Sequence, residues 1–159
     1  SLAGHRAEGR PFEDLAIRAL DRAIELAPES SDVPALKFDY LFGWGRTKEA
    51  QEAGALIVQR LDDSADGLNN FAWGLLTEDS KKGKFNPLAL LAASRASELA
   101  GGESWYILDT LALARFEMGE PAEAVRLEEK AIEIARRTAV PEGQIRALED
   151  ALARFRKGR

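Results

Sequence analysis

Small side chains recur along the chain at helical spacing. Alanines separated by 34, 39 and 35 residues stand at Ala16, Ala50, Ala89 and Ala124. Seven residues after each of them come Ala23, Ile57, Ala96 and Ala131. Ten residues after each come Leu26, Arg60, Leu99 and Ile134. Offsets of seven and ten lie on one face of a helix, and small residues on that face let another helix pack closely. The pattern therefore predicts one recurring helix with a narrow apolar face.

A second helical segment precedes three of these helices. It covers roughly residues 33–43, 68–77 and 104–118. Turn-forming residues separate the two helices of each pair, namely Gly43 with Gly45, Gly83 with Pro87, and Gly119 with Pro121. Glycine and proline at such positions end helices and form turns. The sequence therefore predicts a repeated helix–turn–helix unit.

This repeat resembles the tetratricopeptide repeat, a helical hairpin of about 34 residues that stacks into a superhelix. The best unit, residues 104–135, carries the family's large, small and glycine positions at Leu108, Leu111, Ala112, Gly119, Ala124, Ala131 and Ile134. The unit over residues 33–62 departs from the family, because Lys37 replaces a large apolar residue and Ile57 a small one. The resemblance implies an all-α superhelix, or solenoid, of about three and a half hairpins.

The same resemblance divides the chain into three parts. Residues 1–10 are expected to be a disordered start or the remnant of a preceding helix, residues 11–136 the repeat array, and residues 141–159 a capping helix with a basic tail. The first unit then lacks room for its first helix. We therefore expect either a piece of a longer protein or pairing with a second copy through the N-terminal end, because an unpaired helix leaves apolar surface such as Leu15, Ile24 and Leu26 uncovered.

Three segments make the resemblance more specific, because they are similar to one group of repeat-containing proteins. Residues 68–73, the insertion 77–86 and residues 108–112 are similar to the C-terminal repeat block of some bacterial exported thioredoxin-like proteins (thiol:disulfide interchange proteins). Residues 145–159 are similar to the helix that closes such blocks. This likeness implies a catalytic domain outside the present chain and a periplasmic or exported location. Similar blocks also occur alone or joined to other domains, in which case the location is cytoplasmic.

Composition removes several classes of function. The net charge of −5 argues against general binding of nucleic acid, and no apolar stretch is long enough to insert in a membrane. The absence of cysteine excludes disulfides and thiolate catalysis within this chain, and leaves the redox compartment undetermined. A single histidine, His5, argues against a Ser/His/Asp relay and a multi-histidine metal site. We expect no cofactor, no metal and no catalytic residue.

The remaining charged residues have ordinary interpretations. Adjacent carboxylates such as Glu128 and Glu129 point apart on a helix and are interpreted as solvated.

The insertion 77–86 is either an anion-binding loop or a solvated connection, and its length favours the connection. Cations of residues 136–159 either dock an acidic partner or complement the dipole of the last helix.

The first helices of successive units line a concave groove in the related fold, so we expect a protein or peptide partner there. Helical spacing places the candidate binding residues at Asn69, Asn70, Trp73, Tyr106 and Asp109. Trp73 has packing between hairpins as its alternative role, and Asn70 a backbone contact. Asp109 is costly to bury alone, so it either faces the groove or meets Arg95 or Arg115.

The sequence thus predicts a non-enzymatic scaffold for protein–protein interaction. Tyr106 and Thr110 argue against a carboxylate clamp of the kind found in chaperone-binding members, because they stand where its cations belong. Two other functions stay open. One is a dimerisation or assembly module of an exported thioredoxin-like protein, and the other is a small-molecule or hydrolytic site in the groove.

Overall fold

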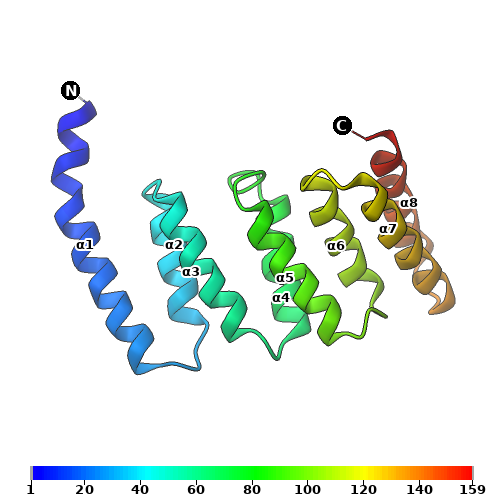
Figure 1. Cartoon of the computed structure of the whole chain (residues 1–159), viewed down its shortest axis with the longest axis horizontal. Helices are drawn as coiled ribbons and strands as arrows, with labels where there is room; N and C mark the ends of the chain where they lie inside the picture. Colours follow the sequence, from blue (N-terminus) through cyan, green and yellow to red (C-terminus); the bar gives the residue numbers. More distant parts are fainter. Residues whose placement is uncertain (1, 159) are drawn as a thin grey trace. The chain divides into compact units, whose positions relative to one another are not determined.

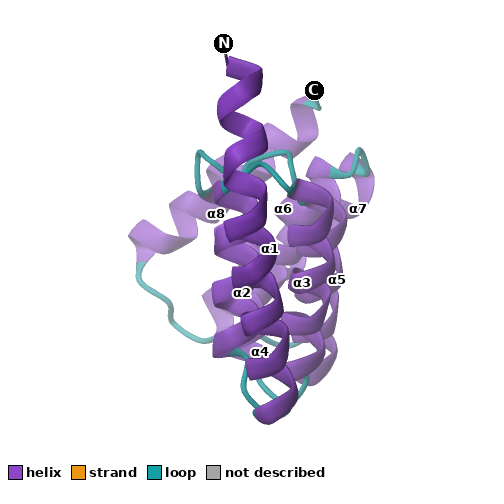
Figure 2. Ribbon diagram, turned by 90° about the vertical axis from the view of Figure 1, so that its left-hand side faces the viewer, coloured by secondary structure: helices purple, strands orange, loops and turns teal. Residues whose placement is uncertain are grey.

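A computed structural model describes the backbone of residues 2–158 and the side chains of residues 11–158. This part of the chain contains eight helices and no strand (Figures 1 and 2). The helices are α1 (Leu2–Leu26), α2 (Asp32–Gly43), α3 (Thr47–Arg60), α4 (Ala65–Thr77), α5 (Asn86–Leu99), α6 (Trp105–Glu117), α7 (Pro121–Arg137) and α8 (Glu142–Lys157). They form two compact units, an N-terminal unit up to Arg60 and a C-terminal unit from Leu61.

The fold is the predicted all-α type, and its helices pair in hairpins. Three hairpins, α2–α3, α4–α5 and α6–α7, follow the single helix α1 and precede the single helix α8. The hairpins agree with the three pairs expected from the spacing of small residues. None of the helices within the described part of the chain is long and apolar enough to cross a lipid bilayer.

Alanine allows close helix packing in the C-terminal unit. Seven alanines of α5 and α7 are completely buried, namely Ala89, Ala92, Ala93, Ala96, Ala124, Ala131 and Ala135. In this unit α6 packs against both α4 and α5, and then pairs with α7. The absence of bulk on these faces brings the helix axes together, so larger residues fill only the spaces between them.

Helix α8 closes the C-terminal unit through its apolar face. A cluster of buried residues joins α7 to α8, consisting of Ile132, Ala135, Ile145, Leu148 and Leu152. Trp105 packs against the same cluster. Since α8 buries apolar surface on α7, its position is fixed by the hydrophobic effect as well as by charge.

The turns use glycine where the chain reverses. Gly119 has φ of 83° between α6 and α7, a conformation that side chains with a β-carbon disfavour. Its N–H donates to the carbonyl oxygen of Phe116, which caps the end of α6. Pro121 follows in the first turn of α7, where its missing N–H costs nothing.

The long connection between α4 and α5 is partly solvated and partly anchored. Two of its lysines pair with nearby acids, Lys81 with Glu78 at 2.7 Å and Lys82 with Asp79 at 2.9 Å. Its last residue, Phe85, is completely buried. The expectation of a solvated connection therefore omits the apolar anchor that holds this segment against the hairpin.

Polar contacts hold α1 to the rest of the N-terminal unit. Arg60 donates to the carbonyl oxygens of Ala27 and Ser30 at 2.7 Å each, just after the end of α1. Lys37 of α2 pairs with Asp21 of α1 at 2.6 Å. Lys37 and Arg60 are the polar residues that weaken the repeat pattern in this unit, and these contacts account for both.

Helix α1 leaves large apolar side chains in solvent. The exposed fractions are 79% for Phe12, 58% for Leu15 and 70% for Leu26. The exposure of Leu15 and Leu26 agrees with the expectation for an unpaired first helix. The backbone is helical from Leu2, but the side chains of residues 1–10, His5 among them, lie outside the described residues, so the interpretation of this segment stays a prediction.

Candidate functional site

The five candidate binding residues occupy different environments on α4 and α6. On α4, Asn70 is exposed and Trp73 is 44% exposed, whereas Asn69 is buried with 7% exposure. No hydrogen bond within the described part of the chain reaches the side-chain oxygen of Asn69. The structure therefore brings Asn70 and Trp73 to the surface and turns Asn69 toward the interior.

Tyr106 links the two first helices of the C-terminal unit. Its hydroxyl group donates to the carboxylate of Asp66 on α4 at 2.8 Å. This bond raises the pKa of Tyr106 above its usual value, because the neutral phenol is the donor. The ring remains 40% exposed, so Tyr106 ties α6 to α4 and still presents a face to solvent.

Asp109 meets a carboxyl group on the next helix. Glu128 of α7 is completely buried and interacts with Asp109 through a hydrogen bond between the two carboxyl groups. Apart from Asp109, no group in the described part of the chain hydrogen-bonds to Glu128. The interpretation of Glu128 as a solvated residue is therefore wrong. Its place four residues after Ala124 and three before Ala131, on the buried face of α7, is the signal that marks it.

Burial controls the protonation of this pair. Burial raises the pKa of Asp109 to about 6, and the hydrogen bond from Glu128 and the charge of Arg154 on α8 oppose the increase. Burial also raises the pKa of Glu128 to about 8, with a further increase from the neighbouring charge of Asp109. At neutral pH the pair holds one proton, so one carboxyl group donates to the other.

Neither expected arginine partner reaches Asp109. Arg95 pairs with Asp62 and Glu98, and Arg115 pairs with Glu120 at 2.9 Å. Asp109 instead borders a pocket.

The pocket lies between α4, α6 and α8 and has a volume of about 390 Å³. Trp73, Asp109 and Leu113 supply its wall on the first helices. Helix α8 supplies the opposite wall with Ala147, Leu148, Asp150, Ala151, Arg154 and Phe155. Sequence reasoning places Trp73 and Asp109 in one site, and it misses the contribution of α8, since no local pattern tells which surface the last helix covers.

Arg154 is held over aromatic rings at this pocket. Its guanidinium carbon lies 5.3 Å from the ring centre of Phe155 and 5.9 Å from that of Phe116. Both distances are within the range of a cation–π interaction. Arg154 acts on Asp109 and Glu128 through its charge, without an ion pair within 4 Å among the described residues.

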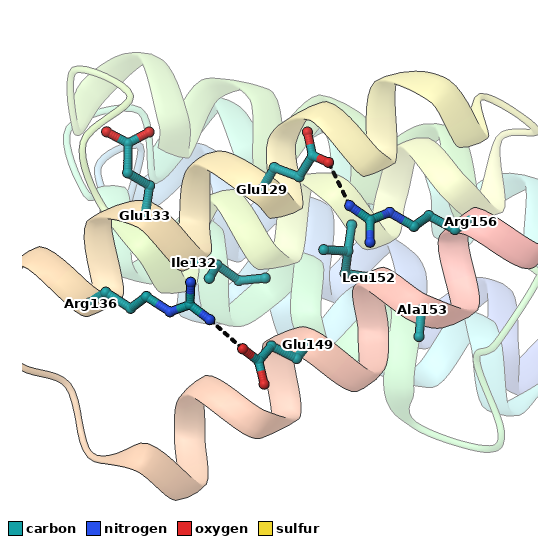
Figure 3. Close-up of a pocket in the computed structure, with 8 residues that line it drawn as sticks. All are labelled: Glu129, Ile132, Glu133, Arg136, Glu149, Leu152, Ala153 and Arg156. Carbon is teal, nitrogen blue, oxygen red and sulfur yellow. Dashed lines mark hydrogen bonds and ion pairs between the residues drawn. The ribbon is translucent and has the colours of Figure 1, made fainter.

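A second hollow of about 560 Å³ lies between α7 and α8. Figure 3 shows two ion pairs across it, Arg136 with Glu149 and Arg156 with Glu129, on either side of an apolar floor. The floor includes Ile132, which packs α7 against α8. Because the charges of these two ion pairs neutralise each other, we take the pocket at Asp109 as the better candidate site. The same ion pairs favour a structural role for the C-terminal cations.

The described residues offer no group of three or more His, Cys, Asp or Glu side chains suited to a metal ion.

No model of a known protein family and no curated protein sequence matches the chain. Among solved structures, the chain is similar to the crystal structure of MamA protein, with 20% sequence identity and a TM-score of 0.46. The similarity covers 97% of this chain and 82% of the MamA chain.

Proposed function

We propose that the chain is a non-enzymatic module that binds a protein partner on the α4–α6–α8 surface of its C-terminal unit. The observation that carries the proposal is the presence of two half-exposed aromatic rings on the first helices, Trp73, which lines the pocket, and Tyr106. Aromatic residues with one face in solvent are enriched at protein interfaces, where they provide large contact area at little entropic cost.

The polar groups on the same surface suit an extended peptide. Asn70 is exposed on α4, and its amide both donates and accepts, as a peptide backbone requires. Asp109 gives the pocket a carboxylate. A surface with aromatic area, one amide and one buried acid recognises a partner through a few strong contacts.

A test of this function starts from peptides selected for binding to the intact chain from a displayed library. Isothermal titration of a selected peptide is then compared for the wild type, Trp73→Ala and Leu91→Ala. Leu91 is a matched control, because it is also an exposed apolar residue, at 52%, on the second-helix surface of α5. We expect Trp73→Ala to weaken binding about tenfold or more with little change in melting temperature. Equal affinity for the two variants contradicts the proposed surface.

A second candidate function is self-association through α1. Phe12, Leu15 and Leu26 expose large apolar side chains on this helix, and such surface favours contact with a second copy. Light scattering after size-exclusion chromatography is expected to show a dimer that Leu15→Asp dissociates. A monomeric mass over the whole accessible concentration range contradicts this candidate.

The wider context remains the one that the sequence resemblance implies, a repeat block appended to an exported thioredoxin-like protein. The chain has no cysteine, so any thiol chemistry belongs to another domain. The sequence of the complete open reading frame tests this context directly. A neighbouring domain without a thioredoxin-like Cys pair contradicts it.

A further inference from the structure

The pocket between α4, α6 and α8 contains more acid than base. Asp109 and Asp150 line it, and Glu128 lies against Asp109 in the interior. Arg154 is the one cation among the described residues that line the pocket, and its guanidinium group is over the rings of Phe116 and Phe155. Two carboxyl groups thus line the pocket and a third lies behind Asp109, against one guanidinium group.

Burial makes this imbalance costly. Glu128 is completely buried and Asp109 is its one hydrogen-bond partner in the described part of the chain. Two carboxyl groups at hydrogen-bond distance cannot both be ionised without strong repulsion. A cation bound at Asp109, in addition to Arg154, offsets the repulsion between the two ionised carboxyl groups. The pair therefore favours a positively charged ligand.

The walls of the pocket fit a long side chain with a charged end. Leu113 and Leu148 provide apolar surface along which an aliphatic stem packs. Trp73 provides an aromatic face, the preferred ring for a cation. A volume of about 390 Å³ lies in the range of small-ligand pockets, roughly 300–1,000 Å³, and exceeds what one lysine or arginine needs.

We propose that this pocket receives a lysine or arginine side chain of the partner protein, with its charged end on Asp109 and beside Trp73. The proposal rests on the proposed binding function and adds the chemistry of the contact. Glu128, which lies behind Asp109, holds a proton in the free protein and releases it when the cation binds.

Cation binding at this pair releases a proton. The groups that face the pair are Asp150 and Arg154 of α8, while α4 contributes the uncharged Trp73 at the pocket. A bound cation favours the ionised carboxyl groups, so affinity increases as the pH rises and levels off once both groups are ionised in the free protein. Affinity therefore increases between about pH 5 and pH 8.

Small probes test the pocket without knowledge of the partner. The probes are n-butylammonium and n-butylguanidinium chloride, and n-butanol is their uncharged control. Two-dimensional ¹H–¹⁵N spectra of the intact chain report binding through the indole N–H of Trp73 and the amides near Asp109. We expect both cations to shift these signals at pH 8, with binding about tenfold weaker at pH 5, and butanol to leave them unchanged.

Two variants and a control test whether the bound cation contacts Asp109. Asp109→Asn is expected to weaken cation binding about tenfold, while Glu98→Gln, which removes one exposed carboxylate from α5, leaves it unchanged. Glu128→Gln is expected to keep the binding and to move its pH dependence to lower pH, because the new amide donates to an ionised Asp109. Asp109→Asn removes repulsion, so it is expected to fold.

Several results overturn the inference. They are equal shifts by butanol and the cations, shifts that avoid Trp73 and Asp109, and unchanged affinity in folded Asp109→Asn. The two proposals fail separately. If library peptides bind and replacement of their basic residues by norleucine changes nothing, the cation site is wrong and the binding function stands. If the cations bind and no peptide does, the binding function is wrong.

Discussion

Glu128 of α7, which is completely buried, and Asp109 of α6, which is partly buried, share one proton at neutral pH. The folded protein binds this proton more tightly than the unfolded chain does, since burial raises both pKa values. Stability therefore falls as the pH rises from the unfolded pKa of Glu128, 4.5, to its folded value of about 8.

Glu128→Gln is expected to stabilise the protein at alkaline pH. The amide has no charge to lose, so the gain is near zero at pH 4 and reaches about 4–5 kcal/mol at pH 9, at about 1.4 kcal/mol for each unit of the raised pKa. Urea unfolding followed by circular dichroism across this pH range measures the effect. A gain that does not depend on pH contradicts the assignment of a raised pKa to Glu128.

Arg60→Leu is expected to loosen α1. The substitution restores the apolar residue of the repeat pattern but removes the hydrogen bonds to the carbonyl oxygens of Ala27 and Ser30, at a cost of about 1–2 kcal/mol. Hydrogen exchange of the α1 amides measures this loss of stability, because a loosened α1 exchanges faster. Arg22→Leu is the control, because it removes an exposed pair with Glu25 on α1 itself, and equal exchange in the two variants sinks this explanation.

Gly119→Ala is expected to destabilise the C-terminal unit by about 1 kcal/mol. No atom lies within 4 Å of the added β-carbon, so the cost comes from the positive φ of 83° alone. Gly143→Ala also meets no atom within 4 Å, and it lies inside α8 without a positive φ. It is expected to stabilise by about 0.5–1 kcal/mol. Thermal unfolding is expected to show a lower melting temperature for Gly119→Ala and a higher one for Gly143→Ala. Changes of the same sign exclude backbone strain as the cause.

Phe85→Ala is expected to cost about 3 kcal/mol, because it empties a completely buried site at the start of α5. Lys82→Ala in the same connection removes one exposed ion pair with Asp79 and is expected to change stability by less than about 0.5 kcal/mol. Urea unfolding compares the two. A small effect of Phe85→Ala means that the connection folds without its anchor.

Local patterns predict the helices of this protein well. The sequence predicts that the first helix of each pair begins near residues 33, 68 and 104, and α2, α4 and α6 begin at Asp32, Ala65 and Trp105. Helix formation and turns depend on residues within a few positions of one another, so the sequence displays them directly. The buried alanines follow the same rule.

The candidate site is harder to predict from the sequence than the helices are. Spacing selected Trp73 and Asp109, which do line one pocket, but it also selected Asn69, which is buried. Glu128 looked like a solvated acid because its neighbour Glu129 is one. The two differ by one position on α7, which turns one side chain into the core and the other toward Arg156.

The amino-acid sequence by itself determined the repeated hairpin, its turns and the small residues that let helices approach, since each of these follows from interactions over a few residues. Only the tertiary structure decided that Glu128 meets Asp109, that α8 supplies the far wall of the pocket and that Arg60 caps the end of α1. These contacts join helices distant in the sequence, and their energies depend on burial and charge, which exist only after the helices have packed.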